Sequence, residues 1–276
     1  MAHAAVLLVS TAAAQVDPAD RAPLRAGDTF TLESEVLDEA RRINVYAPAG
    51  YAESDTTRLP VLYMPDGGVA EDFLHIAGLV QIGSLNGTMR PHLLVGVENT
   101  ERRRDLTGPT EDPRDREIAP RVGGSAAFRA FLRDELRPSI DSLYRTTGET
   151  AIVGESLAGL FVVETLLLEP GLFDTYVAVD PSLWWDGGRL ASDAASLLAA
   201  SLLRDAPPAA RTLYLAGSGQ PQLGAAAHEL YADLDAAGLP GLTVHYAGHP
   251  DETHGSVYHP AALRAFRTVF APLPLD

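Results

Sequence analysis

The sequence contains no cysteine and no lysine, and each absence excludes a class of chemistry. Without cysteine among its 276 residues, the chain can form no disulfide, no thiol nucleophile and no thiolate metal site. All 21 residues of the lysine and arginine class are arginine, which excludes Schiff-base catalysis and the phosphate-binding lysine of a P-loop.

Positive charge is also scarce, because 37 acidic residues give the chain a net charge of −16. Nucleic acid and anionic membrane surfaces both attract basic protein surfaces, so neither is a predicted partner. Hydrophobic residues make up 46% of the chain, enough for a sizeable core. No segment is apolar for about 18 residues, so no membrane span is predicted, and the oligomeric state is left open.

The N-terminus carries a short apolar run, residues 4–14, that ends in small residues. A signal peptide has such a core and cleavage site, although no arginine precedes this one. Two interpretations stay open: export to the periplasm or the cell exterior, or a disordered segment on a cytoplasmic protein. Residues 15–276 contain no internal repeat and no low-complexity linker, which predicts a single domain.

Patterns of strands and helices alternate along that domain. Residues 29–37 and 42–47 alternate polar and apolar positions, as antiparallel strands do. Six further strand patterns, separated mostly by helical periodicity, follow at residues 59–64, 93–97, 151–153, 176–179, 212–215 and 242–246. They predict an α/β-hydrolase fold, with a mostly parallel sheet, helices on both faces and antiparallel N-terminal strands. The charged segment 102–121 is predicted to be a loop at the ligand-binding edge.

A single serine stands where a short apolar strand gives way to a helix, in Gly154-Glu155-Ser156-Leu157-Ala158. This pattern is typical of a nucleophile elbow, in which small residues flank a serine exposed at the sheet edge. Ala158 replaces the second glycine of G-x-S-x-G, a difference of one methyl group. The alternative is a helix N-cap serine without a chemical role.

A serine nucleophile needs a base, and His254 is the favoured candidate. It lies in a polar loop after the last predicted strand, which is the α/β-hydrolase order. His228 falls within a predicted helix, and His75 and His92 precede the serine. No pair of histidines has the H-E-x-x-H spacing, so no metal site is predicted.

Two further roles must be filled around the serine. The N–H of Leu157 is one predicted oxyanion donor, and Gly68 or Gly67, in the turn after residues 59–64, is the other. The carboxylate that orients the histidine is missing from its usual place after residues 212–215.

Asp180, which ends the preceding strand, is the first candidate for this carboxylate, and its rivals are Glu252, Asp251 and Glu229. A Ser–His dyad is also physically possible.

Several segments, in order, resemble the α/β-hydrolase-fold esterases related to enterochelin (ferric siderophore) esterases. They are L-Y-M-P-D-G-G at 62–68, N-T-E-R-R-R-D-L-T at 99–107, G-G, F-L and E-L-R-P between 123 and 138, D-P-S-L-W-W at 180–185 and D-E-T-H-G-S at 251–256. The resemblance covers nearly the whole chain after about residue 29. It implies ester hydrolysis, with Ser156 as nucleophile and His254 as base. Asp180 departs from the family's S-P-S-L-W-W, and we interpret it as a carboxylate moved from one strand end to the preceding one.

The predicted function is a serine carboxylic ester hydrolase that forms an acyl-enzyme with a small-molecule ester and needs no cofactor. Trp184 and Trp185 are predicted to line its pocket, with core or lid packing as the alternative. Arg102 and Arg104 are candidates for binding an anionic group, although ion pairs with nearby acids are the commoner role. The alternative functions are an acyltransferase with the same Ser–His site, and a non-catalytic ligand-binding protein on a decayed hydrolase fold.

Overall fold

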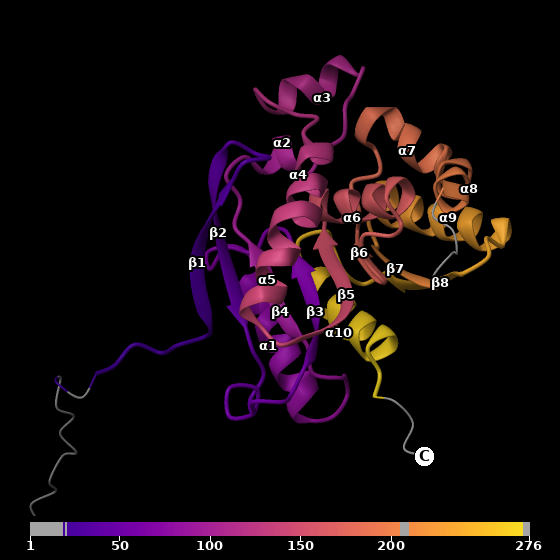
Figure 1. Ribbon diagram of the computed structural model, residues 1–276. Coiled ribbons are helices and arrows are strands. Elements are labelled where there is room, and N and C mark those ends of the chain that lie inside the picture. Colours follow the sequence, from indigo (N-terminus) through magenta and orange to yellow (C-terminus); the bar gives the residue numbers. More distant parts are fainter. Residues whose placement is uncertain (1–18, 20, 205–209, 273–276) are drawn as a thin grey trace, which may run out of the picture.

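The computed structural model describes residues 19, 21–204 and 210–272, and its strands form one sheet (Figure 1). The strand order is β1-β2-β4-β3-β5-β6-β7-β8. The strands are β1 (Asp28–Ser34), β2 (Glu39–Tyr46), β3 (Leu59–Met64), β4 (Leu93–Val97), β5 (Thr146–Glu155), β6 (Thr175–Val179), β7 (Arg211–Ser218) and β8 (Leu242–His249).

The direction of the strands confirms the predicted fold class. β2 pairs antiparallel with both β1 and β4, and every later pairing is parallel. The register places Glu155 of β5 opposite Val179 of β6, and Val179 opposite Ala216 of β7. The carboxyl ends of these strands therefore meet at one edge, where an α/β hydrolase carries its site.

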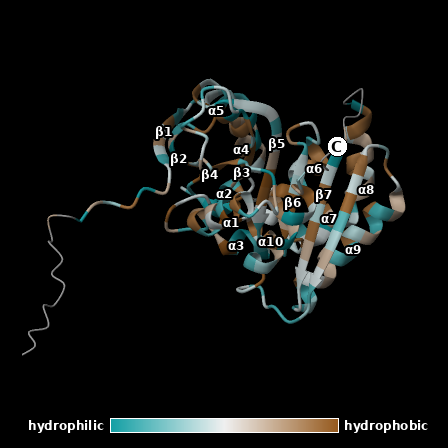
Figure 2. Cartoon of the chain, turned by 90° about the horizontal axis from the view of Figure 1, so that it is seen from below, coloured by the Kyte–Doolittle hydropathy of each residue, from teal (hydrophilic) through white to brown (hydrophobic). Residues whose placement is uncertain are grey.

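Helices cover both faces of the sheet, because alternate residues of the buried strands point to opposite sides. Val61 and Tyr63 of β3 join one apolar cluster, while Leu62 and Met64 join the other. The first face is covered by α4 (Ser125–Phe131), the π-helical η2 (Leu132–Leu136), α5 (Arg137–Leu143), α6 (Leu157–Leu168), α8 (Ala194–Arg204) and α9 (Pro221–Ala237). The second is covered by α1 (Phe73–Leu85) and α10 (Tyr258–Val269). Figure 2 shows apolar residues along the central strands.

Segment 102–121 differs from its prediction, because it contains two short helices, α2 (Arg102–Asp105) and α3 (Pro113–Ile118). Asp112 caps α3 by accepting the N–H of Arg114, and Pro113 occupies the first turn, where no amide donor is needed. Asp115 of α3 accepts a hydrogen bond from the N–H of Asp186, at 2.8 Å. The segment is thereby attached to η3 (Trp185–Gly188), which leads into α7 (Arg189–Ser192).

The predicted signal-like segment, residues 1–14, lies outside the described residues. Within the described ranges, no helix combines the length and apolarity that crossing a membrane requires. The prediction of one domain over residues 15–276 stays a prediction.

Candidate active site

Ser156 occupies a sharp turn between β5 and α6. Its backbone has φ 61° and ψ −121°, a region that costs energy for a residue with a side chain. The turn is crowded, since a Cβ on Gly154 would lie 2.6 Å from the carbonyl carbon and oxygen of Ala158. The same Cβ would lie 2.8 Å from the Ala158 methyl, so that methyl fits only because residue 154 is glycine.

Three side chains from separate strand ends form a chain of hydrogen bonds at this edge. His254, in the loop between β8 and α10, places Nε2 3.0 Å from the Ser156 hydroxyl oxygen. Its Nδ1 lies 2.8 Å from Oδ2 of Asp180, which follows β6. Asp180 is fully buried, and its Oδ1 accepts the N–H of Ser218 at the end of β7, at 2.8 Å. The structure thus brings together Ser156, His254 and Asp180.

The rival carboxylates of the sequence analysis lie elsewhere. Glu252 accepts a hydrogen bond from the hydroxyl of Ser256, at 2.6 Å. Glu229 lies on α9. In the described part of the chain, neither they nor Asp251 form a hydrogen bond or an ion pair with His254.

The electrostatics of the pair suit a neutral histidine that becomes protonated during a reaction. The hydrogen bond to Asp180 raises the pKa of His254, against burial, which lowers it. Burial would raise the pKa of Asp180, but the hydrogen bonds from His254 and Ser218 outweigh burial and lower it. Asp180 therefore stays ionised beside the imidazole and favours its protonated form.

A second carboxylate, which the sequence analysis missed, lies against the same histidine. Glu155 Oε1 is 3.2 Å from Nδ1 of His254. Burial raises the pKa of Glu155 to about 7, although His254 and Arg102 act to lower it. The available signal was its position, because the residue before an elbow serine lies at the strand end where functional side chains converge.

The predicted oxyanion donors differ in availability. Leu157 begins α6, where a helix has no internal acceptor for the N–H. The N–H of Gly67 donates to the carbonyl of Val97, at 2.9 Å. The N–H of Gly68 donates to Oε2 of Glu71, at 2.7 Å. The Gly67 amide is therefore held by the fold, while the Gly68 amide is held by the side chain of Glu71, which also accepts from Asn99 Nδ2 at 2.9 Å.

The two candidate arginines are both held by carboxylates. Arg102 donates to both oxygens of Asp66, at 2.7 and 2.8 Å. Arg104 donates to Glu39 and to Asp105, each at 2.6 Å. Their predicted role in substrate binding stays a prediction, and their observed role is to fix the turn and the segment around the site.

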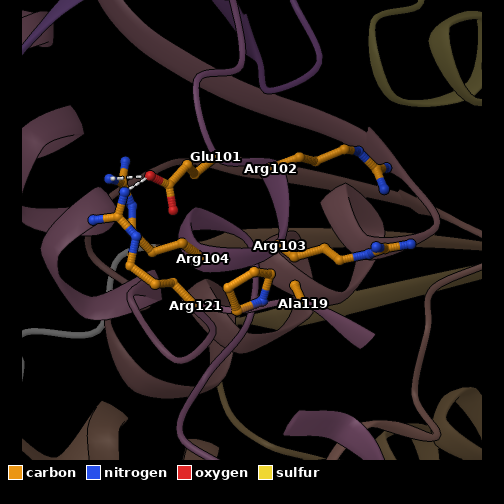
Figure 3. Close-up of a pocket in the computed structure, with 7 residues that line it drawn as sticks. Glu101, Arg102, Arg103, Arg104, Ala119 and Arg121 are labelled. Carbon is orange, nitrogen blue, oxygen red and sulfur yellow. Dashed lines mark ion pairs between the residues drawn. The ribbon is translucent and has the colours of Figure 1, made fainter. Parts of the chain in front are cut away.

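A cavity of about 550 Å³ lies within segment 101–121. Figure 3 shows Arg102 and Arg103 extending in the same direction, away from Arg104 and Arg121, which turn toward Glu101. Arg103 is exposed and donates to the carbonyl of Ile118, at 2.8 Å. Of the residues that line the cavity, Arg102 reaches the turn before Gly67 through its ion pair with Asp66.

The two predicted pocket tryptophans have different environments. Trp184 is 44% exposed and lines a groove between its own loop and α9. Trp185 is buried and donates its indole N–H to the carbonyl of Gly108, at 2.9 Å. Trp185 packs in the core, holds segment 102–121 and lines a cavity of about 220 Å³ beside Gly108, while Trp184 is exposed. The predicted role of both in substrate binding stays a prediction.

The chain resembles known proteins in sequence and in structure. Residues 34–251 match the family described as putative esterase. Ferri-bacillibactin esterase BesA of Bacillus subtilis (strain 168) is 29% identical over 247 residues, which cover 82% of this chain and 81% of that protein. The siderophore enterobactin esterase of Emericella nidulans is 28% identical over 197 residues, which cover 60% of this chain and 64% of that protein.

Two solved structures resemble this chain along most of its length. An IroE-like serine hydrolase from Shewanella oneidensis has a TM-score of 0.78 and 30% identity, over 91% of this chain and 82% of that one. A BES protein from Bacillus cereus has a TM-score of 0.79 at 20% identity, over 92% of this chain and 99% of that one. At 20% identity, the resemblance to the Bacillus cereus protein shows a shared fold only.

Proposed function

Since this chain belongs to the putative esterase family and is related to the enterochelin esterases, it is an ester hydrolase, and we propose that Ser156 is its nucleophile. The observation that carries the proposal is the continuous hydrogen-bond chain from Ser156 through His254 to Asp180. A serine hydroxyl is a weak nucleophile by itself, and an adjacent, oriented base activates it.

In the first step, the hydroxyl oxygen of Ser156 attacks the ester carbonyl carbon and its proton passes to Nε2 of His254. The resulting imidazolium is stabilised by Asp180, which also holds the proton of the neutral ring on Nδ1. Collapse of the tetrahedral intermediate returns the proton from Nε2 to the leaving alcohol. Water, deprotonated by the same nitrogen, then cleaves the acyl-enzyme and releases the carboxylic acid.

The developing oxyanion needs donors aimed at its position. The N–H of Leu157 supplies one donor. The N–H of Gly68 supplies the second, once it has exchanged its bond to Glu71, which Asn99 also holds, for a bond to the oxyanion. Gly67 serves by allowing close approach, because a Cβ there would lie 2.3 Å from backbone atoms of Gly96 and Val97.

Ester-linked siderophores are the first natural substrates to test, because relatives of this chain carry the names of siderophore esterases. The exposed Arg103, which lines the same cavity as Arg102, favours an anionic group on the substrate. The net charge of −16 opposes long-range attraction of such an anion, so recognition depends on short-range contacts.

The test measures hydrolysis of p-nitrophenyl acetate and butyrate, and covalent labelling by an organophosphonate. We expect both in the wild type and neither in Ser156→Ala. Ser142→Ala, an exposed serine on α5, is the matched control and should behave as the wild type does. Absence of Ser156-dependent turnover and of labelling would favour a non-catalytic binding protein, and analysis of products with added alcohols would detect acyl transfer.

A further inference from the structure

Two carboxylates lie within 3.2 Å of one ring nitrogen of His254, and only that of Asp180 is hydrogen-bonded to it. Asp180 Oδ2 lies 2.8 Å from Nδ1 and Glu155 Oε1 lies 3.2 Å from it. The two acids come from neighbouring strand ends, since Glu155 completes β5 and Asp180 follows β6. A histidine base in this arrangement requires one such partner, so the second is unexplained by the proposed mechanism.

We propose that Glu155 is a positioning residue for His254, a second carboxylate that, with Asp180, favours the ring form with the proton on Nδ1. The proposal deepens the function proposed for Ser156 and His254 and rests on it. Glu155 does not touch the reacting atoms in this scheme, and it acts only through the histidine.

The hydrogen bonds of Asp180 show why a second carboxylate matters. Its Oδ1 is fixed by the N–H of Ser218, so only Oδ2 faces the histidine. An asparagine at this position would keep its oxygen on the Ser218 donor and turn its NH₂ toward Nδ1. Nδ1 would then have to accept, which moves the ring proton to Nε2 and blocks the base. The carboxylate of Glu155 forms an ion pair with Nδ1 at 3.2 Å, and a small reorientation of its side chain would let it accept from Nδ1 and prevent this change.

The groups around Glu155 allow this role. Its side chain is 16% exposed, and no described hydrogen bond from another group fixes its carboxylate. Five titratable or charged groups interact electrostatically with Glu155. They are Asp72 before α1, Arg102 of α2, Asp180 after β6, His254 after β8 and Tyr258 of α10. Only Arg102 and His254 can carry positive charge among them, so an imidazolium at residue 254 is the group that favours ionised Glu155 most directly.

A four-enzyme cycle tests the proposal: wild type, Glu155→Gln, Asp180→Asn and the double variant, with kcat/KM measured from pH 5 to 9. At pH 8 we expect Glu155→Gln to lower kcat/KM a few-fold. In the double variant, kcat/KM should fall at least tenfold further than the product of the two single-variant losses predicts. Activity of Asp180→Asn should also rise with pH as Glu155 ionises, and the double variant should lack that rise. If Glu155→Gln lowers kcat/KM by the same factor in the wild type and in Asp180→Asn, the proposal is overturned.

A second readout does not depend on turnover. The ¹⁵N chemical shifts of the His254 ring report which nitrogen carries the proton in each folded variant. We expect Nδ1–H in wild type and in Asp180→Asn, and Nε2–H in the double variant. If Asp180→Asn alone already moves the proton to Nε2, the proposal is wrong. Glu33→Gln, an exposed change on β1, is the matched control.

The two proposals can fail separately. If the wild type shows no Ser156-dependent turnover, the proposed function fails, and the ring shifts still decide the role of Glu155. If Ser156-dependent turnover is present and the cycle is multiplicative, only the role of Glu155 fails.

Discussion

Replacing Glu155 by glutamine should change how the stability of the protein depends on pH. The pKa of Glu155 is raised by burial from 4.5 to about 7, so the folded state binds a proton that the unfolded chain has already lost near neutral pH. Stability from this group is therefore complete below about pH 4.5 and is lost as pH rises toward and through 7. Glutamine has a similar shape and does not titrate, so the variant lacks this loss.

The expected size follows from the shift. One pKa unit corresponds to about 1.4 kcal/mol, so the whole shift corresponds to about 3 kcal/mol. Most of this change falls between pH 5 and 8, which gives about 2 kcal/mol over that range. For a domain of this size, a change of this magnitude moves the melting temperature by about 5 °C.

The assay is thermal unfolding of the wild type and Glu155→Gln at several pH values from 5 to 8.5. The melting temperature of Glu155→Gln should rise relative to the wild type as pH increases, with the largest gap above pH 7. Glu229→Gln makes the same chemical change at an exposed position of α9 and should run parallel to the wild type. If Glu155→Gln also runs parallel, the carboxyl group is not held protonated by burial and the reasoning is refuted.

Three further changes test the turn, the oxyanion donor and the attached segment. Gly154→Ala places a Cβ 2.6 Å from backbone atoms of Ala158, so it should lower the free energy of unfolding, measured with a denaturant, by about 1–3 kcal/mol. An unchanged free energy of unfolding would contradict the crowding. Glu71→Gln keeps an acceptor for the Gly68 N–H but removes the negative charge of residue 71, so kcat/KM for a nitrophenyl ester should rise about fivefold. If kcat/KM does not rise, the Gly68 N–H does not contact the oxyanion. Trp185→Phe leaves the Gly108 carbonyl without its indole donor, which should lower the free energy of unfolding by about 1–3 kcal/mol and speed proteolysis within residues 102–121. Unchanged cleavage there would show that the contact does not hold the segment.

The fold could be predicted largely because its central strands are continuous apolar runs. β3, β4 and β6 are buried along nearly their whole length, as strands covered on both faces must be. α1 could not be predicted in the same way, because its outer face carries exposed Leu74, Ile82 and Leu85, and apolar residues therefore occur all around the helix.

The candidate site was predictable where its signal is local. The turn at Ser156 lies within five consecutive residues, and His254 follows from the order of the chain. The contact of Glu155 with His254 joins residues 99 positions apart through the packing of β5 against its neighbours, so no local pattern contains it. Whether Gly67 or Gly68 has an available amide depended on the rotamer of Glu71, which sequence does not specify.

The different environments of Trp184 and Trp185 give the protein a built-in optical probe. These are the only two tryptophans in the chain, and both follow Asp180 on one loop. Trp184 is 44% exposed and Trp185 is 4% exposed, so a small soluble quencher should reach the first indole and spare the second. All tryptophan emission therefore originates within five residues of Asp180 in the sequence. Occupancy of the groove at Trp184 can be followed by intrinsic fluorescence, without attaching a dye to a chain that offers neither cysteine nor lysine for one.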